Sequence, residues 1–99
     1  MKTVTLIVLA VLLSPNLAHA AGDVANGHMI ARLWCANCHV ISDDGEGKDI
    51  GPPLPMVARE APGHLRSFLT GPHPPMPNFN LSREEIDDVV AYLHSLAGR

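Results

Sequence analysis

Two cysteines lie three positions apart in this 99-residue chain, and a histidine directly follows the second, in the run Cys35-Ala36-Asn37-Cys38-His39. This unit constrains the fold strongly. A domain of this size buries only part of its surface and usually needs a disulfide, a metal or another stabilising cross-link. The chain contains no other cysteine. The chemistry of these five residues therefore decides what holds the domain together.

The first twenty residues differ from the rest. A basic second residue precedes an apolar run over residues 4–13, Pro15 ends that run, and Ala18-His19-Ala20 offers the small residues that signal peptidase recognises. This pattern predicts a secretory signal peptide over residues 1–20 and one exported, periplasmic domain over residues 21–99. The apolar run is short for a membrane span, so an uncleaved anchor is the less favoured alternative, and we expect no span after cleavage.

The charge of the predicted domain limits its partners. It has six lysines and arginines against ten aspartates and glutamates, for a net charge of −4. Nucleic-acid binding requires a basic face that releases counterions, so we expect no nucleic-acid partner. The length leaves room for one small domain and none for a separate nucleotide-binding domain.

Prolines divide the domain. Eight of the nine lie between Pro52 and Pro77, so regular structure is expected mainly toward the two ends. Asp23 is a good N-cap for a helix from residue 24 to about residue 35. Pro62 suits the first turn of a shorter helix over residues 62–70. No stretch alternates as a strand does, which predicts an all-α class with long loops.

The last helix has the clearest signals. Ser82-Arg83-Glu84-Glu85 forms a capping box, and its acidic residues complement the helix dipole. An apolar stripe follows at helical spacing, formed by Ile86, Val89, Val90, Leu93 and Leu96. In the first helix, Gly27 costs about 1 kcal/mol relative to alanine, which is explained if another backbone must pass close to it.

Three kinds of site use two cysteines at this spacing. A disulfide oxidoreductase expects a βαβ surround, which is not predicted here. A zinc site needs four ligands, and no second ligand pair at matching spacing is evident. The third is covalent attachment of c-type haem, for which Cys-x-x-Cys-His is the signature. On a helical turn, Cys35 and Cys38 would point toward one edge of the macrocycle, with His39 beneath the iron. The sequence favours this third interpretation.

The order of further motifs resembles the class I c-type cytochromes, specifically the small bacterial mono-haem proteins. The resemblance covers the whole predicted domain and rests on Gly27, Cys35 to His39, Gly51-Pro52, Met76-Pro77-Asn78-Phe79 and Val89-Val90-Ala91-Tyr92-Leu93. It implies the cytochrome c fold, with three to four helices and long proline-rich loops around one covalently bound haem c. It also implies that Gly27 and Tyr92 mark the crossing of the first and last helices.

The resemblance implies roles for two further residues. Met76, 37 positions after His39, matches the methionine that binds the far side of the iron, and a thioether there raises the reduction potential. Pro52 matches the proline whose carbonyl accepts a hydrogen bond from Nδ1–H of the proximal histidine. His73, in the same loop as Met76, is the main rival and would give a bis-histidine haem of lower potential.

His64 is a further potential ligand, and the others are better explained as packing or surface residues. We expect Met56 to fill a gap in the core, His28 and Met29 to lie in packing or surface positions, and His94 to lie on a solvated helix face. Trp34 is expected in the core beside the haem edge, and Phe79 in packing. The chain departs from many relatives at Ala31, where they carry an aromatic residue. It also has a single lysine in the domain, Lys48, so the lysine ring that some relatives use for docking is absent.

The resulting functional hypothesis is a monomeric, periplasmic one-electron carrier that exchanges electrons with a donor and an acceptor protein. One alternative is a haem subunit dedicated to a single oxidoreductase complex. A haem enzyme or gas sensor with a displaceable distal ligand is less favoured, because the sequence shows no acid–base pair around Met76.

Overall fold

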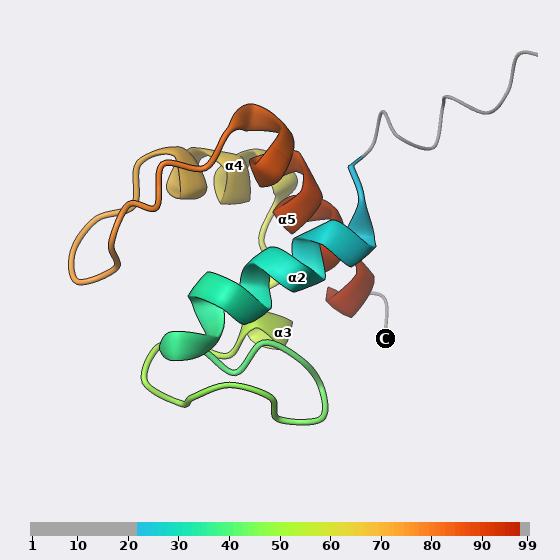
Figure 1. Cartoon of the computed structure of the whole chain (residues 1–99), viewed down its shortest axis with the longest axis vertical. Coiled ribbons are helices and arrows are strands. Elements are labelled where there is room, and N and C mark those ends of the chain that lie inside the picture. The colour runs from blue at the N-terminus through green and yellow to red at the C-terminus, as the bar shows by residue number, and fades with distance from the viewer. Residues whose placement is uncertain (1–21, 98–99) are drawn as a thin grey trace, which may run out of the picture.

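The computed structural model describes residues 22–97, so the predicted signal peptide over residues 1–20 lies outside the described residues. The elements in chain order are α2 (Val24–Trp34), the 3₁₀ turn η2 (Cys35–Asn37), α3 (Leu54–Val57), α4 (Pro62–Thr70) and α5 (Arg83–Ala97) (Figure 1). The only β pairing between residues 22 and 97 is an isolated antiparallel bridge, Val40 to Gly47. The all-α prediction is therefore confirmed.

The helix starts follow the local signals. The side chain of Asp23 accepts a hydrogen bond from the backbone N–H of Asn26 at 3.1 Å, which caps α2. At α5, the Glu85 N–H donates to Ser82 Oγ at 3.1 Å and the Ser82 N–H donates to Glu85 Oε1 at 2.8 Å. This reciprocal pair is the predicted capping box. Pro62 occupies the first turn of α4, where its missing N–H costs no helical hydrogen bond.

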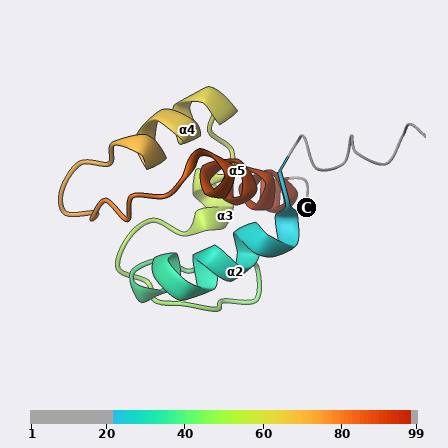
Figure 2. The same cartoon turned by 45° about the horizontal axis from the view of Figure 1, so that its top comes forward.

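Helices α2 and α5 pack against each other and form the frame of the domain (Figures 1 and 2). A Cβ atom on Gly27 would lie 2.6 Å from the Asp88 carbonyl carbon and 2.9 Å from Tyr92 Cβ. Only glycine allows this approach, so the predicted crossing is confirmed. The Asp88 carboxylate reinforces it, accepting from Asn26 Nδ2 at 2.7 Å and from the Asp23 N–H at 2.8 Å.

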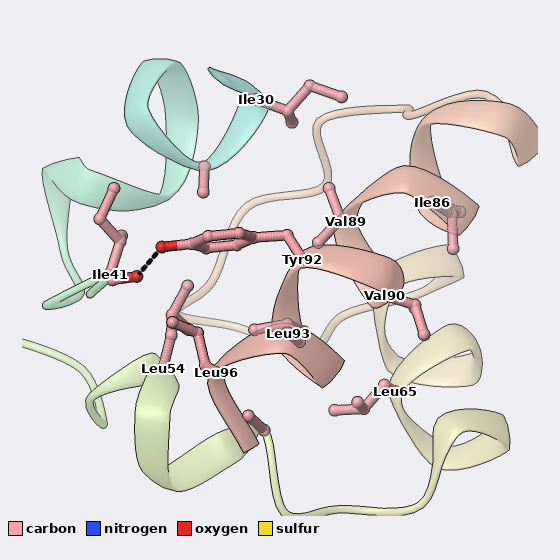
Figure 3. Close-up of a cluster of buried hydrophobic side chains, with 12 residues drawn as sticks. Ile30, Ile41, Leu54, Leu65, Ile86, Val89, Val90, Tyr92, Leu93 and Leu96 are labelled. Carbon is pink, nitrogen blue, oxygen red and sulfur yellow. Dashed lines mark hydrogen bonds between the residues drawn. The ribbon is translucent and has the colours of Figure 1, made fainter. Parts of the chain in front are cut away.

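The core lies between α2, α5 and the connecting segments. Figure 3 shows Tyr92 pointing from α5 toward Ile41, and its hydroxyl donates to the Ile41 carbonyl oxygen at 2.5 Å. Ala31 is completely buried, so a small residue fills the position where many relatives carry an aromatic one. The buried hydrophobic residues are Ile30, Ala31, Ile41, Leu54, Ala58, Leu65, Ile86, Val89, Val90, Tyr92, Leu93 and Leu96.

The structure corrects one prediction within the proline-rich segment. Met56 is 59% exposed, so it does not fill a gap in the core. It lies on α3, a single turn that the sequence did not predict, and this turn directs Leu54 and Ala58 into the core instead. In the part of the chain from residue 22 to residue 97, no helix is long and apolar enough to cross a membrane.

Candidate functional site

A cavity of about 770 Å³ lies between the cysteine–histidine unit, α3, α4 and the loop that leads into α5. This volume is typical of sites that hold a cofactor or a drug-sized ligand. Most of its lining is apolar. The residues that line it are Trp34, Cys35, Asn37, Cys38, His39, Ile50, Gly51, Pro52, Leu54, Val57, Glu60, His64, Leu65, Phe68, Leu69, His73, Pro75, Met76, Pro77, Phe79, Val89 and Leu93.

His39 is held in a defined orientation at this cavity. Its Nδ1 atom lies 2.6 Å from the carbonyl oxygen of Pro52. Because a carbonyl oxygen can only accept, Nδ1 carries the hydrogen and donates it. The lone pair of the neutral ring is then on Nε2, which is the state that binds a metal ion.

Gly51 fixes the ring of His39 from a second direction. A Cβ atom on Gly51 would lie 2.6 Å from His39 Cε1 and 3.0 Å from His39 Nδ1, so only glycine leaves room for the imidazole. The backbone brings Gly51 there, because the N–H groups of Ile50 and Gly51 donate to the Cys38 carbonyl at 3.0 and 2.6 Å. The chain therefore folds back so that Gly51 packs against the ring of His39.

The two cysteines lie at the end of α2, where η2 turns the chain. Cys35 is half-buried, Cys38 is exposed, and no disulfide joins them. Burial raises the pKa of the Cys35 thiol to about 11. Disulfide oxidoreductases depend on the opposite shift, a lowered thiol pKa. In addition, residues 22–97 contain no group of three or more histidine, cysteine, aspartate or glutamate side chains arranged for a metal ion. Neither observation favours the oxidoreductase or zinc interpretations.

Met76 and His73 line the same cavity as His39. A turn joins them, in which the Met76 N–H donates to the His73 carbonyl at 3.2 Å. The His73 ring contacts Phe68 edge to face, with ring centroids 5.1 Å apart. Met29 and Met56 lie outside the lining. The loop thus brings both candidate distal ligands to the cavity.

Two further residues lie at the cavity in positions that the sequence did not predict, Trp34 and His64. Trp34 is 47% exposed and packs against Phe79 with ring centroids 5.4 Å apart, so it lies at the cavity edge and not in the core. His64 lines the cavity and pairs with Glu60 at 3.9 Å. Glu60 precedes the start of α4, so no local pattern in the sequence indicated that His64 lines the cavity. The contact of Gly51 with the His39 ring had no signal in the sequence.

Comparison with known proteins identifies the family. The family model described as cytochrome c oxidase, cbb3-type, subunit III, matches residues 22–93. The chain belongs to the small bacterial c-type cytochromes. Cytochrome c-552 of Bradyrhizobium diazoefficiens is 42% identical over 95 residues, which cover 91% of this chain and 89% of the relative. A cytochrome c-553-like protein of Synechocystis is 38% identical over 77 residues, covering 76% of this chain and 70% of the relative.

A solved structure supports the same assignment. The c-type cytochrome SorU from Sinorhizobium meliloti matches with a TM-score of 0.62 and 30% identity, over 77% of this cytochrome and 92% of that chain. The cytochrome carries a covalently bound haem c and serves haem-based electron transfer. The cavity fits this group: it combines an apolar lining with thiol, imidazole and thioether side chains, and Gly51 leaves the space that the His39 ring occupies.

Proposed function

We propose that this cytochrome is a periplasmic one-electron carrier. In this proposal Cys35 and Cys38 attach the haem by thioether bonds, and His39 and Met76 are the axial ligands of its iron. The observation that carries the proposal is the orientation of His39, whose Nδ1–H donates to Pro52 at 2.6 Å and whose Nε2 is therefore available to iron. When bound, the haem supplies one-electron Fe(III)/Fe(II) chemistry.

The residues of the chain contribute rigidity to that chemistry. Pro52 and Gly51 prevent the His39 ring from rotating, because the Pro52 carbonyl accepts a hydrogen bond from Nδ1–H and Gly51 leaves no free volume beside the ring. Met76 lies between prolines, whose fixed φ angles leave the loop little conformational entropy to lose. Ligands held in this way keep their positions in both oxidation states, which suits fast electron exchange and disfavours a site that opens for a substrate.

The surface near the cavity suits short-lived docking to redox partners. Within residues 22–97, the cavity lining includes no lysine or arginine. The rim around Pro74, Pro75 and Met76 is apolar, and a small contact of this kind is typical of electron-transfer encounters. Electrostatic steering is then weak, so we expect the rate of electron exchange to depend little on salt. The cytochrome is proposed to act as a monomer, with no nucleic-acid partner and no catalytic activity of its own.

A dedicated haem subunit is the second candidate. It is favoured by one observation, that the matching family model is described as a subunit of a cbb3-type oxidase. The two candidates differ in how the protein is isolated. A carrier purifies alone from the periplasmic fraction, whereas a dedicated subunit purifies with a fixed partner from the same fraction.

Visible spectroscopy of the oxidised holoprotein tests the ligand set. The weak long-wavelength band of Met–Fe(III) ligation is expected in the wild type and should be lost, with a fall in reduction potential, in Met76→Ala. Met56→Ala is the matched control, because Met56 is exposed and outside the cavity lining, and should keep the band. A low-spin wild-type spectrum that lacks the band and changes only in His73→Ala would assign the distal position to His73. A high-spin wild-type spectrum without the band would overturn the carrier proposal in favour of an open, enzyme-like site.

Thiol chemistry tests the attachment residues. The denatured holoprotein should contain no thiol that reacts with iodoacetamide, since both sulfurs are proposed to be thioethers. Haem should stay with the chain under those conditions. Cys35→Ala should release one bond and leave haem attached through Cys38 only. A wild-type protein that loses its haem on denaturation would contradict the thioether assignment.

A further inference from the structure

A charged cluster lies outside the haem cavity, where α2 faces the loop over residues 41–50. Arg32 Nε donates to Glu46 Oε2 at 2.9 Å. His28 Nε2 lies 3.5 Å from Glu46 Oε1 and 3.3 Å from Arg32 Nη2. None of these three residues lines the cavity. The proposed function therefore leaves this cluster without a role.

The Nε2 atom of His28 faces a donor and an acceptor at the same time. The Arg32 guanidinium can only donate, so the neutral imidazole accepts from it through Nε2. The Glu46 carboxylate can only accept, so the protonated imidazolium donates toward it. Each protonation state of His28 thus has a partner already in place. Histidine ordinarily changes its charge between about pH 5 and pH 8.

The ring of His28 is also fixed against the core. It stacks on Tyr92 with ring centroids 4.6 Å apart and an interplanar angle of 5°. The hydroxyl of Tyr92 in turn donates to the Ile41 carbonyl (Figure 3). His28 thus contacts both the loop, through Glu46, and the residue that anchors the loop, Tyr92.

This loop leads directly to the proximal histidine. The Ile41 N–H donates to the Glu46 carbonyl at 2.7 Å, so the backbone of Glu46 closes the loop. Two residues later, the Lys48 N–H donates to the His39 carbonyl at 3.2 Å. The same segment then supplies Pro52, which accepts from the His39 ring. Two backbone hydrogen bonds therefore tie the segment that carries Glu46 to the backbone of His39 and Ile41, and the same loop continues to Pro52 at the His39 ring.

We propose that His28, Arg32 and Glu46 form a positioning cluster for His39, through which proton binding at His28 raises the reduction potential of the haem. The inference rests on the proposed function, with His39 as the iron ligand. A protonated His28 adds a positive charge beside the loop whose backbone is hydrogen-bonded to His39, which disfavours Fe(III) relative to Fe(II). Coupling of this kind is reciprocal, so reduction of the iron also favours proton uptake at His28.

The groups around His28 come from three elements: Arg32 on α2, Asp44 and Glu46 on the loop, and Tyr92 on α5. Hydrogen bonding from the Ser42 hydroxyl is the main cause that lowers the pKa of Asp44, which is therefore ionised throughout the histidine range. Asp88, one turn before Tyr92 on α5, is engaged by Asn26.

Spectroelectrochemistry of the holoprotein between about pH 5 and pH 8 tests the proposal. The reduction potential of the wild type should fall as pH rises, and His28→Gln should lose most of this dependence. Glu46→Gln, which keeps the His28–Tyr92 stack, should shift the dependence toward lower pH because the imidazolium loses its acceptor. His94→Gln is the matched control, since His94 is exposed on α5, and should behave as wild type.

Two results overturn the proposal. One is a wild-type pH dependence that persists unchanged in both His28→Gln and Glu46→Gln. The other is its loss in His64→Gln or His73→Gln with His28→Gln unaffected, which would place the coupling inside the cavity. Should His28→Gln not fold, Glu46→Gln alone decides by the same criterion. The Met–Fe(III) band, measured on each sample, separates this outcome from a failure of the proposed function, because that failure removes the band from the wild type.

Discussion

The hydroxyl of Tyr92 donates to the carbonyl oxygen of Ile41 at 2.5 Å, across 51 positions of sequence (Figure 3). Both residues are buried, at 3% and 0% exposure. A buried carbonyl needs a partner, and no water is available to replace a lost one in a packed core. This bond therefore ties the last helix to the first residues after the cysteine–histidine unit.

Replacement of Tyr92 by phenylalanine removes the donor and leaves the Ile41 carbonyl unpaired. The expected loss in the free energy of unfolding is about 1 to 3 kcal/mol, measured by denaturant titration of the holoprotein. Thr70→Ala is a suitable control, because the Thr70 hydroxyl donates within α4 at an exposed position, and should change stability by at most about 0.5 kcal/mol. Equal stability of Tyr92→Phe and wild type would show that the Ile41 carbonyl is otherwise satisfied.

Two glycine-to-alanine substitutions should have opposite signs. In Gly27→Ala the new Cβ would collide with the backbone of Asp88, which forces α2 and α5 apart and should cost about 1 to 3 kcal/mol. In Gly63→Ala the new Cβ would meet no atom within 4 Å, so the gain in helix propensity should stabilise α4 by up to about 1 kcal/mol. Thermal unfolding of both variants measures the difference. A stabilising Gly27→Ala would contradict the close crossing.

Local signals predicted the helices, because caps and periodic stripes act within a few residues. Asp23, Pro62 and the Ser82–Glu85 box lie where the sequence expects them. The single turn α3 was missed, since four residues are too few to show a helical period, and with it the exposure of Met56 was predicted wrongly. Whether a side chain in such a turn faces the core depends on tertiary packing, which the local sequence does not carry.

The candidate site was likewise only partly predictable from the sequence. The cysteine–histidine unit is local, so it could be recognised from five consecutive residues. The contact between Gly51 and the His39 ring depends on how the loop returns, through hydrogen bonds from Ile50 and Gly51 to the Cys38 carbonyl. The approach of Glu46 to His28 depends on the same return. Such pairings need the folded loop and have no signature in residue spacing.

The raised pKa of Cys35 predicts a pH dependence in the haem-free chain. Folding raises this pKa from its ordinary value near 9 to about 11. Below pH 9 the thiol is protonated in both states, and between these values only the unfolded chain ionises, so stability falls as pH rises. The expected loss is about 2 to 3 kcal/mol by the upper end of this window. Urea unfolding of haem-free Cys38→Ala at several pH values should show this fall in the free energy of unfolding.

The control for that measurement is the haem-free double variant Cys35→Ala/Cys38→Ala. It contains the same lysine, tyrosine and arginine side chains, so subtraction of its pH profile isolates the thiol of Cys35. Identical profiles for the single and double variants would show that folding does not bury this thiol.

The contacts of Gly51 and Pro52 with the His39 ring give the last prediction. In Gly51→Ala, a Cβ atom 2.6 Å from His39 Cε1 would push the ring away from Pro52 and weaken the bond that now measures 2.6 Å. Loss of that acceptor makes the imidazole a less basic ligand, which favours Fe(II), so the reduction potential should rise. Gly71→Ala is the control, because its Cβ would meet no atom within 4 Å, and should keep the wild-type potential. If Gly51→Ala also kept that potential and the wild-type spectrum, the ring of His39 would not depend on Gly51 for its position.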